Sequence, residues 1–369
     1  MDFNLLISTL IGGGLALLAF LKMSNVLSVN RKANFYFGLV CLLWASFWLD
    51  NIIDREFLAA NYALAIVLKV SQFLTGVVFF ISVRFYTNPT LRFSKGDLRM
   101  LIAPILFIAL LLVRPVFAAY DVMYVILFQG HSLVFILLSW RTVNKHEKNI
   151  ELFASDIESI DLRWIKYIIY SLVLSVVVVV VYKILKMKQP LNFYINLHLL
   201  IVVYFVAFFS IRQKEIFPRG LKIEDAIGLS DIENSDPVRK TKLMNDDELL
   251  RTKQNLVTQI EASALYLDCE LNLVKLADAM RLSTHQLSYV INNGTGENFF
   301  NFINRFRVKK AETLLTDPNF DHLTIVAIGF DSGFNSKTAF NTAFKKVTAY
   351  TPTEFRKIRT TFQEKLIIN

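Results

Sequence analysis

Short polar and cationic side chains gather on one face of a predicted helix near the C-terminus. The other face carries Phe340, Phe344 and Val347 at spacings of i, i+4 and i+7, which predicts a buried apolar stripe. Hydroxyl, amide and ammonium groups can reach base edges and phosphates, so this face suits double-stranded DNA. Taken singly, each of these residues also fits an ordinary solvated surface. The residues predicted to read bases from this helix are Ser336, Lys337, Thr338, Asn341 and Thr342.

A similar pattern lies upstream, from Leu273 to Asn292. Leu276, Met280 and Leu287 fall where the two short helices of a helix-turn-helix bury against each other. Ser283 is suited to cap the second of these helices. The side chains that remain on its outer face, and are predicted to read bases, are Thr284, His285, Ser288, Tyr289 and Asn292.

A long helix is predicted between the two patterns, from about Glu297 to Thr316. Phe302, Phe306 and Leu315 belong to its apolar side, and arginine and lysine occupy much of the rest. Cations beside DNA-reading helices are suited to neutralise phosphates. The residues predicted to contact phosphate are Arg305, Arg307, Lys309 and Lys310, together with Lys345 and Lys346.

The C-terminal pattern also has fixed spacings that are typical of one family. They are Ile328-Gly329, Gly333-Phe334-Asn335-Ser336, Phe340, Phe344-Lys345, Thr351-Pro352 and Phe355-Arg356. On these residues the C-terminal third of the chain resembles the DNA-binding domain of AraC/XylS-type transcription regulators. The resemblance implies two helix-turn-helices bridged by one long helix, with both recognition helices in successive major-groove segments. The chain departs from the family pattern at Arg281, Gly329 and Ala349, and Arg281 stands where the first turn usually has glycine.

Local chemistry supports the predicted second helix-turn-helix. Gly333 lies between two helical patterns, where a tight turn favours a residue that tolerates positive φ. Asn335 or Ser336 is suited to cap the helix that follows. Pro352 stands at the first position of a predicted final helix, where its missing N–H costs nothing.

The N-terminal part has the composition of a membrane protein. The chain of 369 residues is 54% hydrophobic and contains 32 Phe, and the apolar excess precedes residue 212. A bilayer-spanning helix needs about 20 mostly apolar residues. Seven stretches qualify: Phe3–Leu21, Phe35–Ile53, Tyr62–Phe85, Leu98–Val113, Tyr120–Trp140, Trp164–Leu185 and Phe193–Ile211.

Loop charges predict the orientation of these spans. A C-terminal DNA reader must be cytoplasmic, and with seven spans this places the N-terminus outside. The loops then predicted to be cytoplasmic are rich in Lys and Arg, as the positive-inside rule expects. The outer loops hold Arg55, Arg114 and three lysines between residues 183 and 188. The predicted location is the inner (cytoplasmic) membrane, with several spans and a cytoplasmic C-terminal domain.

The predicted fold class is all-α, with three regions. Residues 1–211 form a seven-helix membrane bundle, 212–245 a flexible cytoplasmic linker and 246–369 a domain with two helix-turn-helices. The linker contains glycine, proline and scattered charges, with a short helix predicted near Ile223 to Ile227. A polar helix from Asp246 to Tyr266 opens the C-terminal domain.

The sequence gives little support for an enzyme. Its two cysteines, Cys41 and Cys269, lie in different compartments, and no metal-ligand spacing or glycine-rich phosphate loop occurs. We therefore predict no catalytic residues, no metal site and no cofactor. The net charge of +9 is compatible with DNA but too small to identify it.

Ionisable groups at membrane depth are candidates for sensing a signal, because burying them is costly unless they are paired or functional. The candidates are Asp50, Asp54, Lys69, His131 and His198. Asp50 and Asp54 also fit a hydrated interfacial position. Lys69 also fits snorkelling to the interface or an internal pair, and the histidines fit ordinary packing.

Three functions are compatible with these patterns. The favoured one is a membrane-embedded, one-component transcription regulator that binds operator DNA in response to a small-molecule or membrane signal. The alternative is a transporter or other membrane protein with a regulatory DNA-binding tail, although the spans show no inverted repeats or broken helices. A protein-binding scaffold fits the exposed Lys, Thr and Asn pattern less well. The flexible linker predicts control through pairing of two readers, so a homodimer is expected. The apolar spans make the lipid bilayer a second expected partner.

Overall fold

The computed structural model describes residues 3–26, 29–53, 55–113, 120–158, 160–185, 191–214, 216–217 and 243–358. Among these residues the regular structure is helical, apart from one isolated bridge between Ala154 and Asn272. The predicted all-α class is therefore confirmed. The chain divides into two compact units. The N-terminal unit comprises residues 1–146 and 162–216, and the C-terminal unit comprises residues 147–161 and 217–369.

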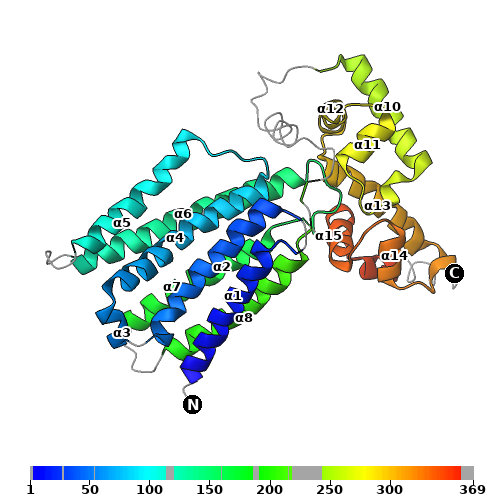
Figure 1. Ribbon diagram of the computed structural model, residues 1–369. Coiled ribbons are helices and arrows are strands. Elements are labelled where there is room, and N and C mark those ends of the chain that lie inside the picture. The colour runs from blue at the N-terminus through cyan, green and yellow to red at the C-terminus, as the bar shows by residue number, and fades with distance from the viewer. Residues whose placement is uncertain are drawn as a thin grey trace. The chain divides into compact units, whose positions relative to one another are not determined.

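The helices of the N-terminal unit follow the apolar stretches of the sequence (Figure 1). They are α1 (Phe3–Met23), α2 (Arg31–Ile52), α3 (Arg55–Ala60), α4 (Tyr62–Thr87), η1 (Lys95–Leu101), α5 (Ile102–Leu112), α6 (Tyr120–Ile150), α7 (Arg163–Ile184) and α8 (Leu191–Arg212). Most begin and end within a few residues of the predicted spans, but α6 continues past Trp140 to Ile150. Helix α2 packs on both α1 and α4, and α8 packs on α1 and α7.

Five helices in the described residues are long and apolar enough to cross a membrane. These candidates are Phe3–Met23, Arg31–Leu49, Tyr62–Thr87, Met123–Ile150 and Phe193–Arg212. Each of the seven predicted spans coincides with a helix, but α5 has only 11 residues and α7 is not among the five. The count of seven spans and the orientation stay predictions.

A polar cluster joins four helices of the N-terminal unit. The ammonium of Lys22 is buried and donates to Asn34 Oδ1 at 3.3 Å and to the Ser210 carbonyl at 2.5 Å. The Tyr86 hydroxyl donates to the same Asn34 oxygen at 2.7 Å. Lys22, near the end of α1, ties this helix to α2 and α8, because a buried ammonium needs acceptors on its neighbours.

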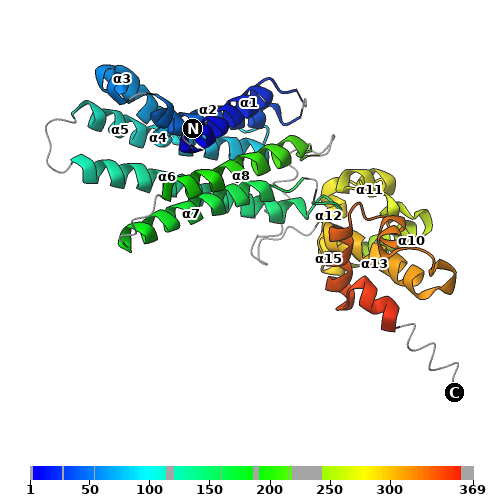
Figure 2. The same cartoon turned by 90° about the horizontal axis from the view of Figure 1, so that it is seen from below.

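The C-terminal unit is built on one long helix, α13 (Phe299–Thr316), as Figure 2 shows. Around it lie α10 (Asp246–Ser263), η4 (Leu265–Leu267), α11 (Leu273–Met280), α12 (Thr284–Thr295), η5 (Pro318–Phe320), α14 (Ile325–Asp331) and α15 (Lys337–Thr348). Residues 352–358 are also helical. One core cluster packs α13, α14 and α15 together through fully buried residues that include Leu315, Ile328, Phe340 and Phe344.

The predicted domain limits at residues 211 and 245 are not tested by this structure. Residues 218–242, most of the predicted linker, lie outside the described residues, as does the helix expected near Ile223 to Ile227. The sequence did not indicate that residues 147–161 belong with the C-terminal unit.

Candidate nucleic-acid interface

The first helix-turn-helix is formed by α11 and α12. Asn272 caps α11 by accepting from the Lys275 N–H at 3.0 Å, and Ser283 and Gln286 form a capping box at the start of α12. Arg281 takes the position of the usual turn glycine with φ 56°, so the turn keeps its left-handed geometry without glycine. The predicted cap at Ser283 is confirmed.

Helix α12 presents most, but not all, of the predicted base-reading residues. Four of them have half-buried side chains: Thr284, His285, Tyr289 and Asn292. Ser288 is only 6% exposed, and its hydroxyl accepts from Asn292 Nδ2 at 3.4 Å. Its prediction as a base reader is corrected here, because a hydroxyl packed against the domain cannot also meet a base edge.

The second helix-turn-helix, α14 and α15, depends on two close approaches of the backbone. Gly333 has φ 91°, and a Cβ there would lie 2.6 Å from the Tyr266 carbonyl oxygen. A Cβ on Gly329 would lie 2.7 Å from the Phe340 ring, so an alanine there would require the ring to shift. Ser336 caps α15 by accepting from the Ala339 N–H at 3.0 Å. The positive φ at Gly333 and the cap at Ser336 confirm the prediction.

Helix α15 places its polar residues outward. Lys337, Thr338, Thr342 and Lys345 are exposed and Asn341 is half-buried. Phe340 and Phe344 are buried as predicted, whereas Val347 is 49% exposed and leaves the predicted stripe. The exposed Val347 is the second-last residue of α15 and lines an open cavity beside α13.

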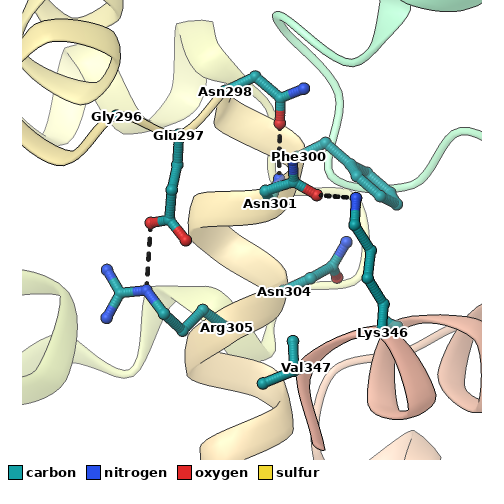
Figure 3. Close-up of a pocket in the computed structure, with 10 residues that line it drawn as sticks. Gly296, Glu297, Asn298, Phe300, Asn301, Asn304, Arg305, Lys346 and Val347 are labelled. Atoms are coloured by element: carbon teal, nitrogen blue, oxygen red, sulfur yellow. Dashed lines mark hydrogen bonds and ion pairs between the residues drawn. The ribbon is translucent and has the colours of Figure 1, made fainter. Parts of the chain in front are cut away.

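Helix α13 and the end of α15 enclose an open cavity of about 520 Å³. In Figure 3 the side chains of Glu297 and Arg305 face each other, and Lys346 reaches toward Asn301. The Arg305 guanidinium lies 3.1 Å from the Glu297 carboxylate, and the Lys346 ammonium donates to Asn301 Oδ1 at 2.8 Å. Both cations are partly exposed and can exchange these exposed partners for phosphate.

Two further cations predicted to contact phosphate lie on α13. The ammonium of Lys309 is exposed and lies 3.1 Å from the Glu261 carboxylate of α10. Lys310 is half-buried. The Arg305 guanidinium also lies 5.6 Å from the Phe302 ring centroid and 5.0 Å from that of Phe306. The ring contacts orient the Arg305 guanidinium, and the ion pair orients the Lys309 ammonium. Lys309 and Lys310 both stay accessible to solvent.

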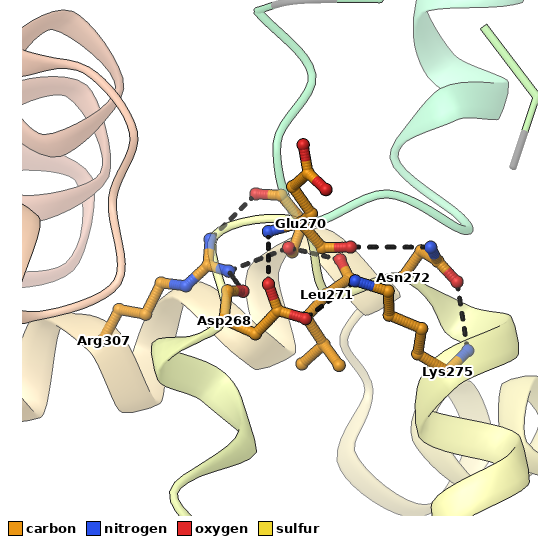
Figure 4. Close-up of polar contacts among 7 residues, drawn as sticks. Asp268, Glu270, Leu271, Asn272, Lys275 and Arg307 are labelled. Atoms are coloured by element: carbon orange, nitrogen blue, oxygen red, sulfur yellow. Dashed lines mark hydrogen bonds and ion pairs between the residues drawn. The ribbon is translucent and has the colours of Figure 1, made fainter. Parts of the chain in front are cut away.

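Arg307 does not fit its predicted role. It is 1% exposed, and its guanidinium donates to the Tyr266 carbonyl at 2.8 Å. It also donates to the Asp268 carbonyl at 2.8 Å (Figure 4). It also donates to the Ser155 hydroxyl at 2.9 Å and the Ser155 carbonyl at 3.2 Å. Burial lowers its pKa to about 10, which leaves it charged at neutral pH, and the Asp156 charge opposes that shift. The prediction is corrected: Arg307 is a structural cation.

The docking segment, residues 147–161, is the part of the C-terminal unit that precedes α7. Its backbone pairs with the chain around the start of α11. The Leu273 N–H donates to the Phe153 carbonyl at 2.9 Å, and the Ser155 N–H donates to the Leu271 carbonyl at 3.3 Å. At the start of α13 the Asn298 amide donates to the Glu151 carboxylate at 3.0 Å. The segment therefore contacts both the first helix-turn-helix and the bridging helix.

The acidic tip of the docking segment, Asp156 to Glu158, reaches the second helix-turn-helix. The Asn335 amide donates to the Asp156 carboxylate, and the Ser336 hydroxyl donates to the Glu158 carboxylate. Asn335 and Ser336 immediately precede α15. The hydroxyl predicted to read a base therefore already serves as the helix cap and binds a carboxylate.

The candidate sensing residues have different surroundings. The Lys69 ammonium lies 5.5 Å from the Tyr124 ring centroid, and His198 Nε2 lies 2.8 Å from the Ser171 hydroxyl. His131 is buried and stacks on Phe73 at 4.0 Å, and neither ring nitrogen has a hydrogen-bond partner among the described residues.

The other two sensing candidates are Asp50 and Asp54. Asp54 lies outside the described residues, and so does the side chain of Asp50 within α2.

Residues 276–358 match a family model described as a helix-turn-helix domain. The model is of the AraC type, so the resemblance inferred from the spacings is confirmed and this part of the chain is an AraC-type DNA-binding domain. A solved structure of a Listeria innocua protein of unknown function is 27% identical. The alignment covers 28% of this chain and 94% of the Listeria innocua chain, with a TM-score of 0.25. The curated proteins contain no match.

Proposed function

We propose that this protein is a membrane-embedded, one-component transcription regulator. Its C-terminal unit binds operator DNA, and its N-terminal unit responds to a membrane or extracytoplasmic signal. The observation that carries the proposal is the pair of capped helix-turn-helices on α13, in residues that match the AraC-type family model. The apolar helices of the other unit supply the membrane part.

The proposed DNA contacts follow from exposure. Recognition helices α12 and α15 read base edges in the major groove. Cationic side chains on α13 and at the end of α15 contact the phosphates. The proposed base readers are Thr284, His285, Tyr289, Asn292, Lys337, Thr338, Asn341 and Thr342. The proposed phosphate contacts are Arg305, Lys309, Lys310, Lys345 and Lys346.

The docking segment supports two membrane crossings between residue 161 and the reader. Because residues 147–161 and 243–358 belong to one unit, they must lie on the same side of a membrane. Helix α8 is a candidate span, and one crossing alone would separate them. We therefore propose that α7 also crosses, which agrees with the seven-span, N-out arrangement and a cytoplasmic reader.

The test is chromatin occupancy of the intact protein. The wild-type chain should occupy discrete genomic sites, and Lys337→Ala with Asn341→Ala should abolish that occupancy at equal protein abundance. A matched control, Lys253→Ala on α10, should keep it. Occupancy that is absent, or unchanged by the α15 variant, would refute the proposed reader. A recovered site would also show which genes respond, and from them the class of signal.

A further inference from the structure

The docking segment is tied to the N-terminal unit at both ends. Helix α6 ends at Ile150, inside the segment, and α7 begins at Arg163, just after it. The two proposed membrane helices are therefore connected through residues that form part of the DNA-binding unit. The chain therefore offers a path from α6 and α7 to the reader that does not include residues 218–242.

The middle of the segment is firmly anchored. Phe153 and Ser155 are 1% and 3% exposed, as buried as the domain core. Ser155 accepts two hydrogen bonds from the Arg307 guanidinium and donates from its hydroxyl to the Leu271 carbonyl at 2.5 Å. The anchor keeps the residues that follow it within reach of α15, since only a short chain separates Ser155 from Glu158.

Those following residues hold the part of α15 that DNA would meet. In a helix-turn-helix the N-terminal residues of the recognition helix contact base edges. The same helix end attracts anions, because its free N–H groups carry partial positive charge. Asp156 and Glu158 bind the Asn335 and Ser336 side chains at this end. Two carboxylates there also repel the phosphates of an approaching duplex.

We propose that the acidic tip is an autoinhibitory contact that DNA must displace from α15. This inference rests on the proposed function, because the tip can inhibit reading only if α15 reads DNA. In the docked state the two carboxylates occupy the start of α15 in place of phosphate. A change in the α6–α7 pair withdraws the tip while the anchor remains, and the second helix-turn-helix becomes available. The switch is contained in one chain and needs no change in pairing.

The decisive variant removes charge but preserves shape. Full-length wild type and Asp156→Asn/Glu158→Gln, in lipid nanodiscs, are titrated with a random-sequence duplex and with genomic duplexes selected by the variant. We expect the variant to bind the selected duplexes roughly tenfold more tightly, because like-charge repulsion is removed. Asp246→Asn/Asp247→Asn, on the first turn of α10, makes the same change in net charge and should leave affinity within about twofold.

The outcomes separate this inference from the proposed function. Equal binding by wild type and variant would overturn the autoinhibitory contact and leave DNA reading intact. An equal gain from the α10 control would also overturn it, because net charge alone would explain the result. If no protein binds any duplex at about 50 mM salt, where phosphate contacts are strong, DNA reading itself fails and the autoinhibitory role fails with it.

A second measurement does not depend on any variant. In wild type, carbodiimide labelling of Asp156 and Glu158 is followed by mass spectrometry with and without saturating selected duplex. Displacement by DNA should increase labelling of both carboxylates, while Glu248 on α10 serves as an internal reference. Unchanged or reduced labelling on DNA binding would show that the tip stays in place, which contradicts the proposal.

Discussion

The guanidinium of Arg307 lies 2.9 Å from the hydroxyl of Ser155, a residue 152 positions earlier in the chain. The same guanidinium donates to the carbonyls of Tyr266 and Asp268. One buried cation on the bridging helix therefore joins the docking segment to the turn before the first helix-turn-helix. A charge buried in this way is stabilised only while its acceptors are in place.

Replacing Arg307 with methionine should destabilise the C-terminal unit by about 3–5 kcal/mol, because several buried acceptors lose their donor. The measurement is hydrogen exchange of α13 amides in the full-length protein. Arg305→Met is the matched control: its ion pair with Glu297 is exposed, so the loss should be under about 1 kcal/mol. Equal losses at the two positions would mean that the buried hydrogen bonds of Arg307 contribute nothing specific.

Ala349→Gly should stabilise the C-terminal unit. Ala349 ends α15 with φ 66°, a conformation that costs an L-residue about 1–2 kcal/mol and glycine little. The greater freedom of glycine in the unfolded chain offsets part of this gain, so we expect a net gain of about 0.5–1 kcal/mol. Protection of α15 amides from exchange reports it. Gly333→Ala should have the opposite sign, since its Cβ would meet the Tyr266 carbonyl. A loss from Ala349→Gly would show that the left-handed end of α15 is unstrained.

Base readers and phosphate-binding residues should differ in how their effect depends on DNA sequence. His285→Ala and Asn341→Ala, on the recognition helices, should each cost about 1–3 kcal/mol on a selected duplex and little on random DNA. Arg305→Ala and Lys310→Ala should weaken binding to both duplexes and reduce the salt slope by about 0.9 for each phosphate that is no longer neutralised. Titrations at several salt concentrations distinguish the two. Equal effects on both duplexes for the recognition-helix variants would show that these residues do not read bases.

Local signals in the sequence predicted the local structure of the reader. Ser283 and Ser336 cap their helices, and Gly333 takes positive φ, because capping and turn geometry depend on a few adjacent residues. Arg281 shows the limit of that reasoning. Its left-handed φ of 56° is imposed by the packing of α11 on α12 rather than by its own preference.

Interactions between segments distant in sequence were not predictable in the same way. The Ala154–Asn272 bridge and the burial of Arg307 join segments whose pairing leaves no periodic pattern. In the sequence Arg307 resembles its neighbours Arg305 and Lys309. It differs from them in the structure because it is buried and binds Ser155, Tyr266 and Asp268. The short polar run around Asp156 resembles any loop between two spans.

Acid should weaken the turn before α11. Burial acts to raise the pKa of Asp268, but hydrogen bonds from the Lys275 ammonium and the Glu270 N–H, with the charges of Lys275 and Arg307, lower it overall. A carboxyl with a lowered pKa contributes stability that is full above its unfolded pKa of about 4 and is lost as pH falls through the folded value. The difference in melting temperature between wild type and Asp268→Asn should therefore be larger at neutral pH than below the unfolded pKa. A difference in melting temperature that grows as the pH falls would contradict this prediction.

The last prediction concerns how the chain crosses the membrane. A reporter that is active only in the cytoplasm should work when fused after Ile211, and again within the docking segment after Glu147. A reporter that is active only outside should work when fused after Phe57. The physical reason is that the docking segment and the reader form one unit and must lie on the same side of the membrane. Helices α7 and α8 must therefore both cross or both stay on one side.

A further fusion of the outside reporter after Leu185, between α7 and α8, distinguishes these two arrangements. Activity there shows two crossings. Its absence, with cytoplasmic activity after Ile211, would reduce the number of spans to five and place α8 on the membrane surface or within the protein.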